Sequence, residues 1–149
     1  MSHDWSWYGY ELHYIPMKRT IFIEPFINTN NADLPDYKIY CFNGVPMMCQ
    51  VICNRSHNET ISHYDLNYNI QHIYDQIGFQ APPCQKPSTF NTMIQYARIL
   101  SADFKFVRCD FYEIQGTTYF GEMTFVPGAG YLKYKDDMAD YILGNQLCL

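Results

Sequence analysis

The sequence lacks the features that mark membrane-spanning and exported proteins. Its 149 residues contain no apolar run near the ~20 residues that a membrane-spanning helix requires. The first residues carry no basic start and no apolar core of the kind found in signal peptides. We therefore expect a cytoplasmic protein without a membrane span.

Surplus positive charge and metal-binding cysteine patterns are also missing. Charged residues make up only 17% of the chain and its net charge is −5, which argues against nucleic acid as a partner because such surfaces are basic. The six cysteines include no Cys-x-x-Cys pair, and the five histidines follow no zinc-site spacing. In a cytoplasmic protein we expect these thiols to be reduced.

Aromatic residues, in contrast, are abundant. They form 17% of the chain, with 14 Tyr and 10 Phe, and hydrophobic residues form 48%. This composition excludes a disordered chain and favours β-structure, where aromatic side chains pack well. The length suits one domain spanning residues 1–149.

Two hairpins are predicted by apolar–polar alternation around short turns. One has strands over 104–112 and 117–125 around Gln115-Gly116, and the other has strands over 37–42 and 45–53 around Asn43-Gly44.

The remaining segments have weaker or helical patterns. An apolar stripe over 87–103 predicts a helix with Ser88 as its N-cap. A short strand is expected over 20–27, an irregular loop covering the site over 56–85, and a short helix over 131–141. Together these elements predict an α+β fold with a mostly antiparallel sheet of about five strands and helices packed on one face.

The hairpin over 104–125 carries the strongest chemical signal. Strand alternation predicts that the hairpin brings Asp110 and Glu122 close together with Arg108 beside them, and the glycine-rich loop 127–130 follows. Two carboxylates and an arginine suit Mg²⁺ and a phosphate group. A solvated strand face with a structural ion pair explains the same spacing, and spacing alone favours that simpler interpretation.

The wider string FVRCDFYEIQGTTYFGEMTFVPGAG resembles the metal-binding end of ATP-grasp enzymes, in particular the TupA-like branch of teichuronopeptide and polysaccharide biosynthesis. General ATP-grasp enzymes carry Asn where this chain has Thr124, and the TupA-like branch resembles it in having Thr. Further matching strings begin at Trp5, Asp36 and Tyr64. The resemblance implies that the fold is the C-terminal subdomain of an ATP-grasp protein.

The resemblance also implies the ligands and the residues that bind them. ATP and Mg²⁺ are expected, with Asp110 and Glu122 as metal ligands and Arg108 on the transferring phosphoryl group. The remaining expected nucleotide-site residues are Glu24, Asp36, Thr124 and Gly128, and the expected substrate- or phosphate-binding residues are Lys38 and Arg55. For Lys38 a solvent-facing strand position is an equal alternative, and for Arg55 the alternative is an exposed strand end.

The implied reaction is carboxylate–amine ligation through an acyl phosphate, with a carboxylate or glycan-linked substrate. The resembled enzymes also have a first lobe with a strand lysine and a glycine-rich loop, for which this chain offers no candidate. We therefore expect a C-terminal half without its N-terminal lobe, which binds nucleotide weakly and does not turn over.

Three alternatives stay open at this point. The chain is a non-catalytic binding module, the partner of a separate first lobe, or a polysaccharide-biosynthesis glycosyltransferase. The last has no support from a DxD string. An uncovered apolar edge would also favour a homo-oligomer.

Overall fold

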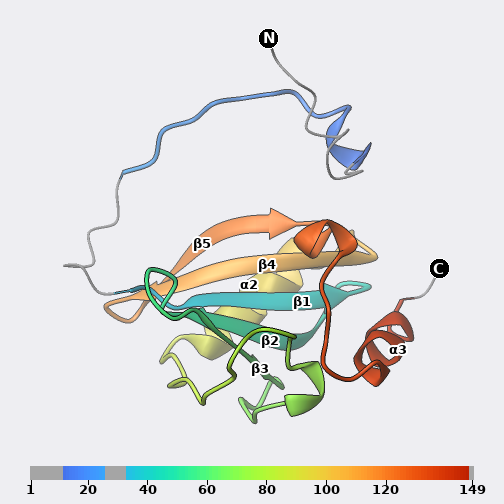
Figure 1. Ribbon diagram of the computed structural model, residues 1–149. Coiled ribbons are helices and arrows are strands. Elements are labelled where there is room, and N and C mark those ends of the chain that lie inside the picture. Colours follow the sequence, from blue (N-terminus) through green and yellow to red (C-terminus); the bar gives the residue numbers. More distant parts are fainter. Residues whose placement is uncertain (1–11, 26–32, 148–149) are drawn as a thin grey trace.

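The computed structural model describes residues 12–25 and 33–147, and its centre is one antiparallel sheet. Five strands lie in the order β3-β2-β1-β4-β5 (Figure 1). Their bounds are Asp36–Phe42 (β1), Val45–Cys53 (β2), Thr60–Tyr64 (β3), Phe106–Ile114 (β4) and Thr117–Thr124 (β5). The predicted α+β class and the antiparallel five-stranded sheet are confirmed.

Both predicted hairpins are present, and each turns on an amide-glycine dipeptide. Asn43 and Gly44 have φ angles of 51° and 77°, and Gln115 and Gly116 have 50° and 73°. Two consecutive residues with positive φ are what a two-residue hairpin turn needs to match the twist of its strands. The hairpins are joined by antiparallel pairing of β1 with β4.

Strand β3 corrects the expectation of an irregular loop over 56–85. It pairs with the second half of β2, from Cys49 opposite Tyr64 to Cys53 opposite Thr60. All five of its residues are buried, including Ser62 and His63. Because these two polar side chains are buried and hydrogen-bonded, the strand lacks the apolar–polar alternation from which a strand is predicted.

Helix α2 is shorter than predicted, spanning Phe90–Ser101 after the N-cap residue Thr89. Ser88 is not the N-cap. Instead the Glu113 carboxylate, on β4, accepts hydrogen bonds from the Thr89 backbone N–H and hydroxyl at 2.7 Å each and from the Ser88 hydroxyl at 3.0 Å. The helix start is therefore fixed by the sheet.

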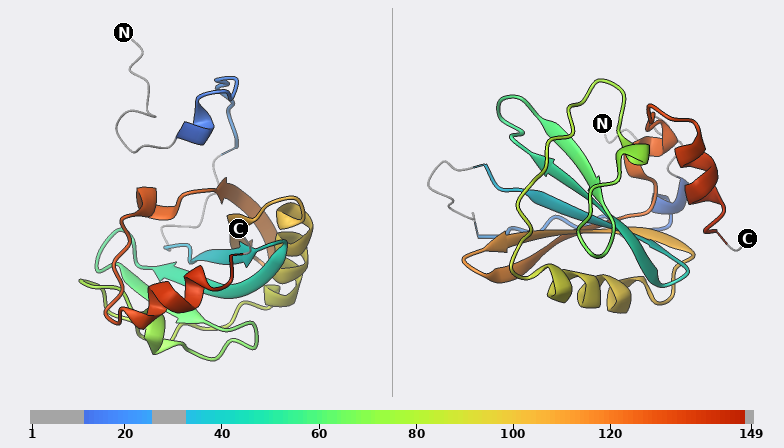
Figure 2. Two further views of the ribbon diagram at one scale, coloured as in Figure 1. Left: turned by 90° about the vertical axis from the view of Figure 1, so that its right-hand side faces the viewer. Right: turned by 90° about the horizontal axis from the view of Figure 1, so that it is seen from below.

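The two helices lie on opposite faces of the sheet, which corrects the expectation that helices share one face (Figure 2). Helix α2 packs against the face that holds the main core, a cluster of Tyr37, Ile39, Cys41, Cys49, Val51, Tyr64, Phe90, Met93, Ala97, Val107, Cys109 and Phe111. Helix α3, Met138–Gly144, packs through Ala139 on the other face, against Tyr40 and Phe42. It begins later than the predicted helix 131–141 because Tyr134 enters this second cluster as a non-helical residue.

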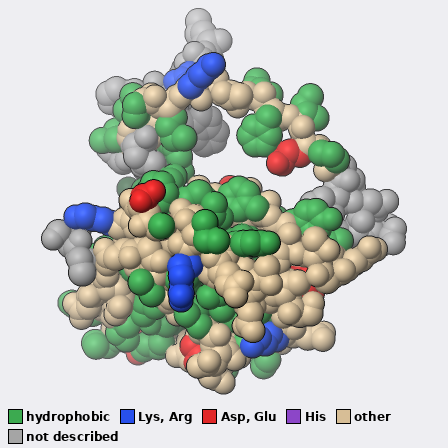
Figure 3. Space-filling model, turned by 180° about the vertical axis from the view of Figure 1, so that it is seen from behind, with side chains coloured by type: hydrophobic (Ala, Val, Ile, Leu, Met, Phe, Trp, Pro, Cys, Tyr) green, Lys and Arg blue, Asp and Glu red, His purple; other side chains and the backbone are tan. Residues whose placement is uncertain are grey.

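The segment 12–25 stands away from the sheet (Figures 1 and 3). It begins with a short 3₁₀ helix, η1 (Leu12–Tyr14), and continues without regular structure. The strand predicted over 20–27 is wrong for residues 20–25, and residues 26–27 lie outside the described part. Ile21 and Ile23 are each 96% exposed, so their apolar side chains gain nothing from the sheet.

Across residues 12–25 and 33–147, none of the helices is both long enough and apolar enough to cross a membrane.

The contact between β4 and the start of α2 gives a test of the fold. Glu113→Gln removes a charged acceptor for three hydrogen bonds at a helix N-terminus, and we expect the free energy of unfolding to fall by about 1–2 kcal/mol. Chemical denaturation measures this loss. The matched control is Asp103→Asn, an exposed acid just beyond the other end of the helix, which should change stability by less than about 0.5 kcal/mol. Equal effects of the two changes would contradict the assignment.

Candidate functional site

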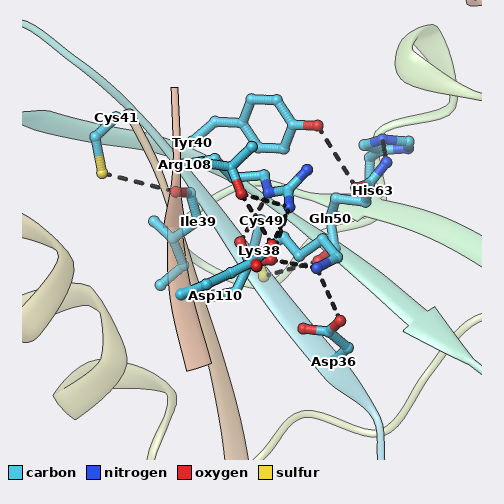
Figure 4. A network of polar contacts seen from close by, with 12 residues as sticks. Asp36, Lys38, Ile39, Tyr40, Cys41, Cys49, Gln50, His63, Arg108 and Asp110 are labelled. Carbon is cyan, nitrogen blue, oxygen red and sulfur yellow. Dashed lines mark hydrogen bonds and ion pairs between the residues drawn. The ribbon is translucent and has the colours of Figure 1, made fainter. Parts of the chain in front are cut away.

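A row of polar side chains crosses the sheet on the face opposite α2. The strand register places His63 opposite Gln50, Gln50 opposite Lys38, and Lys38 opposite Asp110. Directly paired residues on neighbouring strands point to the same face, so the four side chains form one line across β3, β2, β1 and β4 (Figure 4). All four are buried.

The Asp110 carboxylate is the centre of this row. Arg108, two residues earlier on β4, donates to it with both arms of its guanidinium, Nε to Oδ1 and Nη2 to Oδ2, at 2.7 Å each. The Lys38 ammonium also contacts Oδ2. Asp110 is only 1% exposed, so two cations neutralise one buried anion.

A β-bulge brings Glu122 to the same place. Pairing between β4 and β5 shifts between Cys109 and Phe111, so that Gly121 and Glu122 both lie opposite Asp110. Glu122 Oε1 accepts hydrogen bonds from Arg108 Nη2 at 3.2 Å and from the Thr124 hydroxyl at 3.0 Å. Unlike Asp110, the Glu122 side chain is 64% exposed and faces solvent.

Glycine at position 121 lets the bulge approach β4 closely. A Cβ there would lie 3.0 Å from the Tyr112 ring and 3.2 Å from the Asp110 carbonyl oxygen. With any larger residue at this position, the Tyr112 ring and the β4 backbone would have to move by a few tenths of an ångström.

The opposite end of the network is the Asp36 carboxylate, at the start of β1. Its Oδ2 lies 2.8 Å from Lys38 Nζ and 2.8 Å from Arg55 Nη2. Its Oδ1 is buried and has no hydrogen-bond partner among the described residues. Burial raises the pKa of Asp36 above its ordinary value, although the Lys38 and Arg55 cations act in the opposite direction.

These groups surround a pocket of about 290 Å³. Its lining comes from the 12–25 segment, both hairpins and the turn that follows β2: Glu24, Asp36, Lys38, Arg55, Asp110, Tyr112, Phe120, Gly121 and Glu122. Arg108 and Thr124 are hydrogen-bonded to one another at 2.9 Å and to this lining. The structure therefore gathers all the predicted site residues except Gly128.

Gly128 lies apart from the pocket, in the short helical turn η3 (Pro127–Gly130). Its φ of 56° belongs to the left-handed region, and a Cβ there would lie 2.6 Å from Leu132 Cδ2. The glycine thus permits a tight turn packed on Leu132, and it makes no contact with the ion-pair network.

Gln50 and His63 were missed by reasoning from the sequence. The Gln50 amide nitrogen lies 3.1 Å from His63 Nε2, and the Tyr40 hydroxyl donates to Gln50 Oε1 at 3.5 Å. Gln50 stands between the apolar residues Cys49 and Val51, which was a visible sign of a special position. Its alignment with Lys38 depends on strand register, which the sequence does not show.

The charges of the network balance. Lys38, Arg55 and Arg108 carry three positive charges, and Asp36, Asp110 and Glu122 carry three negative ones. Asp110 and Glu122 both contact the same Arg108 nitrogen, so two carboxylates converge with the oxygen chemistry that Mg²⁺ prefers. Within residues 12–25 and 33–147 no three His, Cys, Asp or Glu side chains are placed to hold a metal ion, so a metal here would need further oxygens from a bound phosphate.

Comparison with known proteins gives one result. The family model described as TupA-like ATPgrasp matches residues 1–148. No curated protein and no solved structure matches the chain significantly.

Asp110 and Glu122 should differ sharply in their effect on stability. Asp110→Asn removes the buried anion that Arg108 and Lys38 share and leaves Lys38 with Asp36 alone, and we expect the free energy of unfolding to fall by about 3–5 kcal/mol. Glu122→Gln, the matched change on an exposed carboxylate, should cost less than about 1 kcal/mol. Urea denaturation of both variants checks the contrast, and a small loss in Asp110→Asn would contradict a central role for this carboxylate.

His63 should make the stability depend on pH. Burial lowers the pKa of His63 to about 4, and the Asp75 carboxylate opposes this effect. In the unfolded chain the pKa is about 6.5, so between these values the unfolded state binds more protons and stability is lost as the pH falls. From pH 7.5 to pH 5 we expect a loss of about 2 kcal/mol.

Denaturation at several pH values measures this slope in the wild type and in His63→Met, which should flatten it. A wild-type slope in His63→Met would assign the pH dependence to other groups.

Proposed function

Since this chain belongs to the TupA-like ATP-grasp family, we propose that its charged pocket binds the phosphate groups of ATP together with Mg²⁺. The observation that carries the proposal is one ion-pair network of three cationic and three anionic side chains, five of which line the pocket together with Glu24. Burying Asp36, Lys38 and Asp110 is costly, because each of these charges loses water. A charged cluster that is buried at this cost beside an open pocket supports a binding role.

The three cations suit phosphate oxygens. Arg108 presents a planar fork of N–H donors, which matches a phosphoryl group, and Lys38 supplies a compact ammonium. Arg55 is half-exposed and extends over the pocket from the end of β2. In this proposal the three side chains position the phosphates, and Arg108 stabilises the charge on the transferring group.

The carboxylates suit the metal. Asp110 and Glu122 would hold Mg²⁺ jointly with phosphate oxygens, and Thr124 adds a hydroxyl oxygen beside Glu122. When bound, Mg²⁺ neutralises charge on the phosphate oxygens. Asp36 would orient Lys38 and Arg55 by holding both of them on one oxygen atom.

Glu24 lies at the pocket on the 12–25 segment, outside the sheet. There its carboxylate would accept hydrogen bonds from the ribose or the base. A pocket of about 290 Å³ is at the lower end for a site that encloses a whole small molecule, roughly 300–1,000 Å³. It therefore suits the phosphate end of the nucleotide, with the rest lying along the segment.

The reaction proposed for the complete site is phosphorylation of a carboxylate to an acyl phosphate, which an amine then attacks. A carboxylate or glycan-linked substrate and a role in cell-surface polysaccharide biosynthesis are proposed from the family resemblance alone. Positioning carries most of such a reaction, so a half-site should bind without turnover.

A second candidate is that the chain acts as the partner of a separate first lobe. It is favoured by the apolar side chains of Ile21, Phe22 and Ile23, which are 96%, 74% and 96% exposed beside the pocket. Figure 3 shows hydrophobic side chains along this segment, outside the body of the domain. A lobe packed there would cover them and would close the pocket from above.

The test is calorimetric titration of the full chain with ATP, with and without Mg²⁺. We expect weak binding that requires Mg²⁺ and that falls at least about 10-fold, roughly 1.4 kcal/mol, in Glu122→Gln. Glu122→Gln is preferred to a change at Asp110 because its exposed side chain can be altered without unfolding the sheet. No ATP hydrolysis by the isolated chain is expected.

The control is Asp103→Asn, an exposed acid outside the pocket, which should bind as the wild type does. Binding without Mg²⁺, or unchanged binding in Glu122→Gln, would overturn the metal assignment. No binding by a folded wild-type chain would favour the non-catalytic alternative.

A further inference from the structure

Two cysteines outside the charged pocket lie in direct contact. Cys53 is the last residue of β2, and Cys84 lies 31 positions later in the chain. Their sulfur atoms are 2.7 Å apart. Both side chains are partly exposed, so a small solute can reach them from solvent.

The position of Cys84 is set by contacts that do not involve its sulfur. Its backbone N–H donates to the Tyr64 hydroxyl at 2.5 Å. On either side, the Ser62 hydroxyl donates to the Pro82 carbonyl at 2.6 Å and the Tyr68 hydroxyl to the Gln85 carbonyl at 3.0 Å. Cys53 is fixed by its pairing with Thr60. Contacts that do not involve the sulfur atoms therefore hold the two thiols together.

We propose that Cys53 and Cys84 are a redox-active dithiol that a peroxide oxidises to an intramolecular disulfide. In the first step the Cys84 thiolate attacks one peroxide oxygen, which breaks the O–O bond and gives Cys84 sulfenic acid and, from hydrogen peroxide, water. In the second step the Cys53 sulfur attacks Cys84 Sγ, which forms the S–S bond and releases the hydroxyl as water. The two thiols are oxidised by two electrons, and hydrogen peroxide is reduced to two waters.

The contact between the two thiols favours one order of attack. Their shared hydrogen bond lowers the pKa of Cys84 below its ordinary value and raises the pKa of Cys53 above it. The thiolate is the nucleophile, so Cys84 reacts first and Cys53 resolves the product.

The chain contains its own comparison pair. Cys41 and Cys109 are neighbours on β1 and β4 in the core under α2, where both are 0% exposed. A peroxide cannot reach these thiols without unfolding of the core. The two pairs thus differ in access to solvent. If oxidation is selective for the site, only the exposed pair should react; if all cysteines react alike, both pairs should be oxidised.

The experiment treats the fully reduced, folded chain with hydrogen peroxide, blocks the remaining thiols and maps the peptides by mass spectrometry. A Cys148→Ser background removes the cysteine that lies outside the described residues. We expect one cross-link, Cys53 to Cys84, with Cys41 and Cys109 recovered as blocked thiols. Because the bond closes a loop of about 30 residues, Tm should rise by roughly 5–15 °C.

Two single variants test the order of attack. In Cys53→Ser, Cys84 should stop at sulfenic acid, which dimedone traps; in Cys84→Ser, Cys53 should stay unlabelled. Circular dichroism confirms that both are folded. The proposal is overturned if wild type forms no Cys53–Cys84 cross-link, if the buried pair oxidises equally fast, or if Cys84 goes on to sulfinic acid without closing the bond.

Discussion

The burial of one carboxylate, that of Asp110, constrains much of the structure. A charge removed from water in the middle of a sheet needs close partners, and here these are Arg108 on its own strand and Lys38 on the neighbouring strand. The second partner is available only if β1 and β4 pair in one register. A shift of one residue would turn Lys38 into the apolar core and leave Asp110 with a single cation. The ion pairs and the core therefore specify the same register.

The two faces of the sheet have different roles, since one holds the main core and the other holds the charged pocket. One face is apolar and closed by α2, and its cluster includes the fully buried Phe111, Ile39 and Met93. The other is polar at the Asp36 end of β1 and apolar at the Phe42 end, where α3 packs. Because α3 covers only that apolar end, the charged end stays open at the pocket. The second helix thus shares the face of the site and leaves the site accessible, because it packs only at the Phe42 end.

Much of this arrangement could be predicted from local patterns, and the rest depends on contacts between distant segments. Alternation and turn dipeptides located both hairpins, and the apolar stripe located α2. The gathering of Lys38, Arg55 and Asp36 around Asp110 was suggested by family resemblance. Nothing in the sequence shows that the two hairpins pair with each other through β1 and β4. Strand β3 was not predicted because Ser62 and His63 are buried and hydrogen-bonded, so the usual apolar–polar alternation is absent. The motif predicted that Gly128 contacts the nucleotide. In the structure this residue lies in a tight turn that packs on Leu132.

The strand order β3-β2-β1-β4-β5 has a consequence for how the molecule reaches its native state. Each hairpin joins strands that are adjacent in sequence, so it closes a short loop, while β1 and β4 meet only after the chain between Phe42 and Phe106 has returned. Pairings across long loops are entropically expensive and tend to form late. The charged pocket draws Lys38 from one hairpin and Asp110 from the other, so it is absent from any intermediate in which only the hairpins exist. Any ligand that occupies the pocket would therefore favour the completed chain over every partly assembled form.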